Sequence, residues 1–460
     1  MKQQIASNGP QEKSFYRMIG TLVIPIIIQN IINTAVNAAD IIMLGYVSQT
    51  ALSASALANQ PFNIVGFIYY GVSSGMAIMA TQYWGRKDCR TIERVLGIAL
   101  RIALGFAILF FIAAFFFPRF VMRIYTSETD VINAGVSYMR IISVTMLFSA
   151  VTQMYLNVQR CIERVKLSTF VMTSSLLINV VLNACFIFGL GPFPKLGLIG
   201  VAVATLIARF FELCCCIIDS LRNKLVKIRI SYIFERNKLL FRDFTKYAVP
   251  ALMNDVVASF GFSMYSVIMG HLGSDIVAAN SVAVVARQFG SVFAFGIAHG
   301  CAIIIGKTLG ENKLELGRQY AKKSLQLAAI FGALGGVVMI LMRPVIVNIS
   351  QLDGQAADYL RTMVLIQSYY VIGMAINITF FSGIFRSGGD ARFGFWVDAI
   401  TLWCWMIPMG FLLAFVLKLA PIWVYFFLML DEFFKMGPCY LHYRKGKWVR
   451  NITRDEISES

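Results

Sequence analysis

Charged residues are scarce in this sequence of 460 residues. They make up 14% of the chain, whereas hydrophobic residues make up 58%; soluble domains carry about 25% and roughly 45–50%. A soluble globule could not hide that much apolar surface. The apolar residues also occur in blocks of about 20, the length that crosses the hydrocarbon core of a bilayer as a helix. The composition therefore predicts an all-α membrane protein.

Several functional motifs are also missing. The sequence has no Gly-x-x-x-x-Gly-Lys-Ser/Thr phosphate loop, so nucleotide hydrolysis is not expected to supply energy. Its three histidines and nine cysteines show no ligand spacing, which argues against a bound metal. The apolar blocks contain no nucleophile–base pair. We therefore expect no catalytic residues, no enzyme activity and no cofactor beyond a transported ion.

The apolar blocks predict twelve membrane spans. These are Ile19–Tyr46, Leu57–Tyr83, Leu96–Pro118, Val131–Leu156, Leu167–Leu190, Leu198–Ser220, Tyr247–Gly270, Asn280–Ile305, Ser324–Met342, Thr362–Phe385, Phe393–Leu417 and Ile422–Tyr443.

The net charge of +17 is explained by topology. With the N-terminus inside, the cytoplasmic segments hold 30 Lys and Arg and the outer loops hold 6. This asymmetry predicts a multi-pass protein of the cell (inner or plasma) membrane with both termini in the cytoplasm. Some basic residues could contact anionic membrane lipid. No basic stripe interleaved with aromatic residues points to nucleic acid.

The two halves of the chain repeat each other. In a single alignment of the halves without gaps, one proline and four glycines of the first half fall on the same residues of the second. The pairs are Pro25/Pro250, Gly45/Gly270, Gly71/Gly296, Gly75/Gly300 and Gly85/Gly310.

Each half contains six predicted spans, an even number, so both halves enter the membrane from the same side and form a parallel repeat. We expect an N-terminal lobe over 1–221, a cytoplasmic linker over 222–246 and a C-terminal lobe over 247–460. Two lobes around a shared site are a common plan among transporters.

Four polar residues of the first half fall at a similar depth within predicted spans. Asp40 lies about six residues, or roughly 9 Å, from the outer end of the first span. Asn179 and Asn183 share a face of the fifth span, and Thr205 lies about seven residues into the sixth. Inserting a carboxylate at the bilayer centre costs about 2.5–3.5 kcal/mol, so its presence within a span indicates a functional role. The oxygens could hold Na⁺, or Asp40 could carry a proton. Alternatively, the amides and hydroxyl only join helices.

Two carboxylates of the second half form another candidate site. Asp255 and Asp398 lie at similar depth from the inner ends of the seventh and eleventh spans. If they are neighbours, one should hold a proton or meet the substrate. The position equivalent to Asp255 in the first half is the neutral Asn30. The alternative is that Asp398 lies at the interface and is solvated.

Several segments resemble one known family. These are ADIIMLGYVSQTALSASALA (Ala39–Ala58), its counterpart MYSVIMGHLGSDIVAANSVA (Met264–Ala283), NVVLNACFIFGL (Asn179–Leu190), GLIGVAVATLIA (Gly197–Ala208), PALMND (Pro250–Asp255), FRSGGD (Phe385–Asp390) and WVDAITLWCWMIP (Trp396–Pro408). In order and spacing they resemble the multidrug and toxic compound extrusion (MATE) family.

The resemblance covers nearly the whole chain and implies a cation-coupled exporter of bulky, often cationic and aromatic compounds. In that family a cation site is built from the positions matching Asp40, Asn179, Asn183 and Thr205. Some members have Asp where this chain has Asn183, a departure that removes one charge from the site.

These observations predict an antiporter that exports small drug-like compounds in exchange for H⁺ or Na⁺. We expect it to work as a monomer. One monovalent cation entering at about 100 mV supplies about 2.3 kcal/mol, enough for a gradient of order 50-fold. The alternative is a flippase for a lipid or lipid-linked glycan. Such a protein needs several cationic side chains for a pyrophosphate head, and the first six spans carry few.

Overall fold

The structure, a computed structural model, describes residues 8–45, 47–350 and 352–454, and the regular elements in these ranges are all helical. The first half contains α2 (Asn8–Gly45), α3 (Gln49–Ala58), α4 (Gln60–Gly85), α5 (Cys89–Phe116), α6 (Pro118–Tyr125), α7 (Thr129–Cys161), α8 (Val165–Phe188), α9 (Leu198–Arg222) and α10 (Ile230–Phe234).

The second half contains α11 (Lys238–Gly270), α12 (Ser274–Gly310), α13 (Leu314–Ser350), α14 (Gly354–Ile378), α15 (Ala391–Ala399), α16 (Ile407–Phe411), α17 (Pro421–Leu428) and α18 (Asp431–Lys445). Three π-helical segments, η1 (Thr379–Phe385), η2 (Ile400–Met406) and η3 (Leu412–Val416), lie among them.

Eleven helical segments in the described ranges are long and apolar enough to cross a membrane. They confirm the all-α membrane fold. The twelfth predicted span, Ile422–Tyr443, is not one helix. It divides into α17 and α18 at a turn over Met429 and Leu430, and α18 then begins with Asp431 and Glu432. Each piece is too short to span the bilayer alone.

The chain forms two compact units, and the division between them cuts α2 and α11. The first unit comprises residues 1–27 and 253–453, and the second comprises 28–252 and 454–460. The cuts follow Ile27 and Leu252, which are equivalent positions of the sequence repeat, and each lies shortly beyond a proline, Pro25 or Pro250. These units divide the chain differently from the predicted lobes, because they group residues 1–27 with the second half. The predicted lobe bounds stay a prediction.

Glycines of the repeat make equivalent close contacts in the two units. In the second unit, a Cβ at Gly75 of α4 would lie 2.2 Å from the Cβ of Ala248 on α11. In the first unit, a Cβ at Gly300 of α12 would lie 2.5 Å from Cγ2 of Val23 on α2. Val23 and Ala248 are themselves equivalent positions of the repeat. Only glycine permits this approach of two helices, so the repeated spacing has the same packing role in both units.

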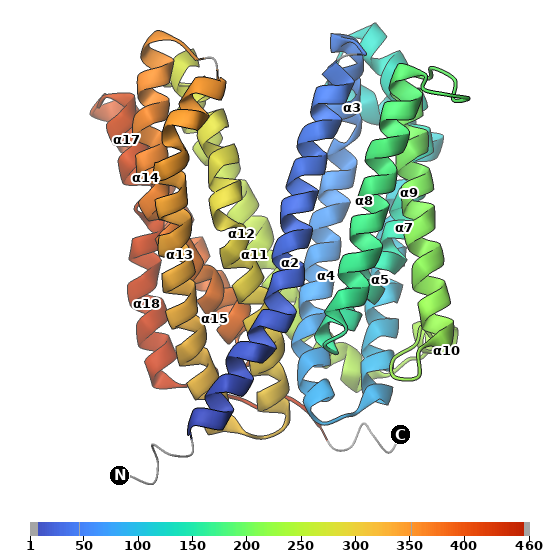
Figure 1. Ribbon diagram of the computed structural model, residues 1–460, viewed down its shortest axis with the longest axis vertical. Coiled ribbons are helices and arrows are strands. Elements are labelled where there is room, and N and C mark those ends of the chain that lie inside the picture. The colour runs from blue at the N-terminus through green and yellow to red at the C-terminus, as the bar shows by residue number, and fades with distance from the viewer. Residues whose placement is uncertain (1–7, 46, 351, 455–460) are drawn as a thin grey trace. The chain divides into compact units, whose positions relative to one another are not determined.

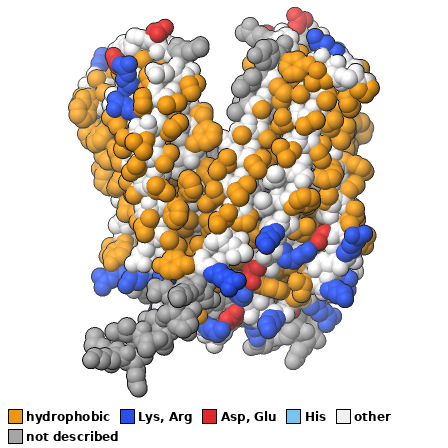
Figure 2. All heavy atoms as spheres, viewed as in Figure 1, with side chains coloured by type: hydrophobic (Ala, Val, Ile, Leu, Met, Phe, Trp, Pro, Cys, Tyr) orange, Lys and Arg blue, Asp and Glu red, His pale blue; other side chains and the backbone are white. Residues whose placement is uncertain are grey.

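Within each unit the helices pack around a buried core. In the second unit α7 contacts α4, α5 and α9, and α8 packs along α9 (Figure 1). In the first unit α12, α13 and α14 contact one another, and α18 packs on α14. The outward sides are apolar: Leu109, Phe170, Ile330 and Leu341 are all more than 60% exposed. Figure 2 shows hydrophobic side chains along the visible sides of the helices, as expected for a surface in contact with lipid.

Residues of the predicted linker pack on the second unit. The side chain of Glu93 on α5 accepts hydrogen bonds from the backbone N–H of Lys227 (3.0 Å) and from Arg229. Arg101, farther along α5, donates to the backbone carbonyls of Ile233 and Glu235. The connection between the halves is therefore held against α5 rather than extended.

Candidate functional site

Three of the four residues predicted in the first half lie together between α8 and α9. The side-chain amide of Asn179 donates to the hydroxyl of Thr205 (3.1 Å), and that of Asn183 donates to the Asn179 carbonyl oxygen (3.3 Å). Thr205 in turn donates to the backbone carbonyl of Val201 (2.9 Å). Asn179 and Asn183 are buried. The side chain of Asp40 lies outside the described residues, although its backbone is part of α2.

This group of amides and a hydroxyl is neutral by itself. Hard cations prefer oxygen ligands, and the three side chains bring amide and hydroxyl oxygens together inside the second unit. Because the described part carries no charge, a cation held here needs a carboxylate. The side chains on α8 and α9 are therefore compatible with the predicted oxygen site. The contribution of Asp40, its charged member, stays a prediction.

Asp255 and Asp398, the two residues predicted in the second half, belong to one polar network but do not touch directly. Arg386 donates to Asp255 (2.9 Å) and to the side-chain oxygen of Asn254 (3.0 Å). The Asn254 amide then donates to Asp398 (2.6 Å). Asn254 and Arg386 therefore separate the two carboxylates. Asp398 is 8% exposed, so the solvated alternative does not describe it.

The network continues to α18 through Lys435. Its ammonium group lies 3.1 Å from carboxylate oxygens of Asp398, Asp431 and Glu432. Glu432 also accepts a hydrogen bond from the side-chain amide of Asn377 on α14 (2.8 Å). The carbonyl oxygen of Asn377 has no hydrogen-bond partner among the described residues, although the residue is 1% exposed.

Negative charge exceeds positive charge in this network. It contains four carboxylates and two cationic side chains, a formal charge of −2 when all six are ionised. Five of the six residues are buried, and Asp255, with its side chain 19% exposed, is the most accessible. Arg287 forms no ion pair with these carboxylates in the described part of the chain; it lies over the rings of Phe262 and Tyr370.

Local helix geometry brings the network together. Arg386 follows the π-helical segment η1, and Asp398 lies two residues before η2. A π-helical turn inserts an extra residue and so changes the face on which later side chains appear; such turns are frequent at functional sites. The sequence places Arg386 in a cytoplasmic loop, but its side chain is 7% exposed and paired with Asp255.

Sequence reasoning missed Asn254, Asn377, Arg386 and Lys435 as members of the site. The available signal was that polar side chains other than carboxylates also occur inside the predicted spans. Asn254 stands beside Asp255, and Asn377 lies within the tenth predicted span.

Comparison with known proteins gives consistent matches over the chain. The MatE family profile matches residues 25–185 and 250–435, two segments that begin at equivalent positions of the repeat, Pro25 and Pro250. The uncharacterized transporter YisQ of Bacillus subtilis (strain 168) is 24% identical over 98% of this chain and 99% of its own. The probable multidrug resistance protein NorM of Halalkalibacterium halodurans is 24% identical, covering 89% and 90%.

Solved structures share the fold at low sequence identity. The Vibrio cholerae MATE transporter VcmN in its bent form superimposes with a TM-score of 0.85 at 15% identity, covering 94% of this chain and 97% of that one. A multidrug resistance MATE family transporter of the MOP superfamily, in an outward-facing conformation, gives 0.83 at 16% identity, covering 94% of each chain.

Proposed function

The chain belongs to the MatE family of transporters, and from this premise we propose that it exports small amphipathic or cationic organic compounds across the cell membrane in exchange for H⁺ or Na⁺. Membership confirms the family resemblance seen in the sequence and makes the chain a multi-pass membrane transporter rather than an enzyme. Several relatives are named multidrug resistance proteins. The coupling ion, the substrate class, the monomeric state and the cytoplasmic termini are parts of the proposal.

The excess negative charge of the network in the first unit is the observation that supports coupling most strongly. Buried charges are tolerated when paired, and an unpaired buried charge is costly. With two carboxylates more than cations, the network favours binding of protons or of a small cation. The network would hold such a cation only while the protein around it excludes solvent. A conformational change that admits solvent would therefore release the cation.

Asp255 is suited to be the exchange point of this network. It is the member with the greatest exposure, and its bond to Arg386 connects it to Asn254 and, through Asn254, to Asp398. A proton or cationic substrate reaching Asp255 would weaken the Asp255–Arg386 pair and leave Arg386 with fewer acceptors. The arrangement therefore links occupancy at Asp255 to the interior charges around Lys435.

The oxygen group on α8 and α9 supports a second cation site in the other unit. Asn179, Asn183 and Thr205 would supply neutral oxygens and Asp40 the charge. The four residues form a ligand set of the kind that hard cations prefer. Loss of Asp40 would then abolish binding, whereas loss of one amide would weaken it.

Transport in liposomes tests the proposal. Purified protein is reconstituted, an inward gradient of H⁺ or Na⁺ is imposed, and movement of a cationic dye against the ion is followed by fluorescence. We expect one of the two gradients to drive dye movement in the wild type and to drive little in Asp398→Asn. The control is Asp358→Asn, which removes an exposed carboxylate paired with Arg361. Dye movement unaffected by both gradients would contradict coupled export.

A further inference from the structure

The short helix α6 has features of a segment that lies at the membrane–water boundary. It connects α5 and α7, two membrane spans, at the point where α5 ends and α7 begins. Phe116 and Phe117, just before it, and Phe120 and Ile124 within it are each 60% or more exposed. Large apolar side chains on an amphipathic segment at the end of a span are typical of insertion at the lipid interface.

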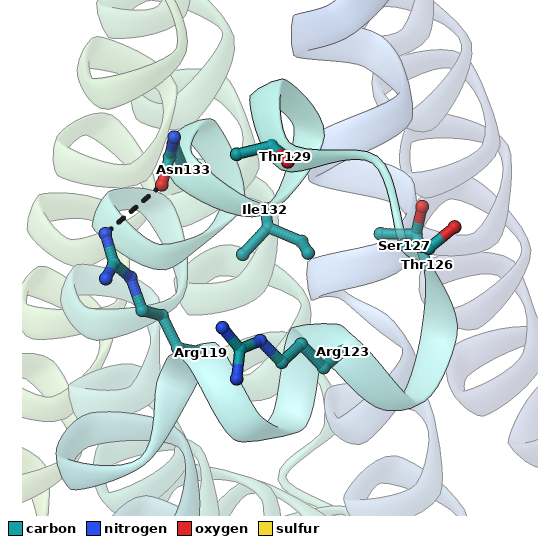
Figure 3. Close-up of a pocket in the computed structure, with 7 residues that line it drawn as sticks. All are labelled: Arg119, Arg123, Thr126, Ser127, Thr129, Ile132 and Asn133. Carbon is teal, nitrogen blue, oxygen red and sulfur yellow. Dashed lines mark hydrogen bonds between the residues drawn. The ribbon is translucent and has the colours of Figure 1, made fainter.

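Two arginines of α6 line a pocket beside this apolar surface. Arg119 and Arg123 are one helical turn apart, and the cavity they share has a volume of about 550 Å³. Its other lining residues are Thr126, Ser127, Thr129, Ile132 and Asn133. Figure 3 shows both guanidinium groups on the side of α6 that faces the start of α7.

The arginines have no carboxylate partner in the ranges that the structure describes. Arg119 donates only to the side-chain oxygen of Asn133, at 3.3 Å, and Arg123 makes no ion pair or hydrogen bond through its side chain there. The hydroxyl of Thr126 accepts from the backbone N–H of Glu128 (3.2 Å), which leaves its own hydrogen available to a ligand. The pocket thus offers charged and neutral donors to an anion.

The second half of the chain does not repeat this pair of arginines. In the gap-free alignment of the halves, Arg119 falls on Pro344 and Arg123 falls on Asn348, with a single arginine, Arg343, beside them. Two arginines one helical turn apart are therefore specific to the first half.

We infer that this pocket binds the phosphate of an anionic phospholipid. Guanidinium groups recognise phosphate oxygens through paired, charge-assisted hydrogen bonds. The hydroxyls of Thr126, Ser127 and Thr129 add donors. A cavity of about 550 Å³ is larger than inorganic phosphate needs, and the exposed aromatic side chains beside it suit acyl chains. A bilayer lipid meets both requirements at once, whereas a soluble anion uses only the hydrogen-bond donors of the pocket.

Native mass spectrometry of the purified full-length protein tests this inference. Protein is incubated with phosphatidylglycerol or with phosphatidylcholine, and the retained lipid is counted for the wild type, Arg119→Gln/Arg123→Gln and Arg361→Gln. Arg361 is an exposed arginine of α14 paired with Asp358, so its replacement is a matched control. We expect the double variant to lose about tenfold in phosphatidylglycerol affinity, the effect of removing roughly 1.4 kcal/mol of binding, and the control to match the wild type.

A single variant and a competing anion complete the experiment. Arg123→Gln alone breaks no hydrogen bond in the described ranges and reports on the site should the double variant fold poorly. Inorganic phosphate is added as a competitor. Displacement of the lipid by millimolar phosphate would assign the pocket to a soluble anion, and retention of phosphatidylglycerol at the wild-type level by both variants would rule out the site. Either result overturns the inference.

Discussion

The ammonium group of Lys435 lies 3.1 Å from a carboxylate oxygen of Asp398, and this contact joins α18 to α15 in the interior of the first unit. Lys435 is 4% exposed and faces two further carboxylates, those of Asp431 and Glu432, at the same distance. One cation thus holds three acidic side chains from two helices. The network contains two more carboxylates than cationic side chains, and the proposed coupling depends on this excess of negative charge.

Replacement of Lys435 is expected to destabilise the protein. Lys435→Met leaves three buried carboxylates without their shared cation, and breaking a buried pair from one side costs about 3–5 kcal/mol. The expected result is a clear fall in Tm or loss of folded protein in detergent. Adding Asp431→Asn to Lys435→Met should recover part of the loss. Lys313→Met removes an exposed partner of Glu311 and should leave the Tm unchanged; equal Tm values for both single variants would contradict the charge balance described.

Asp255 is expected to distinguish charged from neutral substrates. It is the most exposed carboxylate of the network, so a cationic compound can reach it at the least cost in desolvation. In Asp255→Asn, export of a cationic dye should fall by about tenfold, and export of a neutral dye should fall less. The measurement is fluorescence efflux from cells or liposomes. Equal loss for both dyes would indicate a proton or folding role, and unchanged export of both would end the proposal for this residue.

Asp40→Asn is expected to abolish coupled export without loss of folded protein. The carboxylate is the proposed charged member of the group formed by Asn179, Asn183 and Thr205, and without it that group is neutral. Export under an imposed ion gradient and the Tm of the purified variant are the two measurements. Folded Asp40→Asn protein that exports at the wild-type rate would remove Asp40 from the mechanism.

Cysteine labelling tests the predicted orientation. The α8–α9 loop is exposed and carries Lys195, and the start of α11 carries the exposed Lys238. In a background with the exposed Cys404 replaced by serine, an impermeant reagent added outside should label Lys195→Cys and miss Lys238→Cys. The reverse pattern would place the termini outside the cell and contradict the charge asymmetry of the loops.

Much of the fold follows from patterns that one sequence displays. Span length is set by the bilayer, and the glycines of the repeat, such as Gly75 and Gly300, occupy places where only glycine permits the observed approach of two helices. The break between α17 and α18 was missed because α17 and the turn after it form one apolar run that ends only at Asp431. Hydropathy alone does not locate a turn inside such a run.

The two candidate sites could be predicted from the sequence to different degrees. Asn179 and Asn183 are four residues apart on one helix, so the helical period alone predicts that they share a face. The network around Asp398 depends on the rotation of several helices about their axes and on the π-helical segments η1 and η2. Arg386 lies in the turn after η1, where the sequence places it, but its side chain is buried and paired with Asp255. No short-range pattern carries that information.

Release of a cation when substrate binds is the measurement that tests the central claim most directly. Purified wild-type protein in weakly buffered detergent solution is mixed with a cationic substrate, and released H⁺ and Na⁺ are measured with a pH indicator and an ion-selective electrode. The account predicts release of about one cation per bound substrate, as one-for-one exchange requires, and a much smaller release from Asp398→Asn that still binds substrate. Substrate binding by the wild type without release of either ion, or equal release from Asp398→Asn, would contradict it.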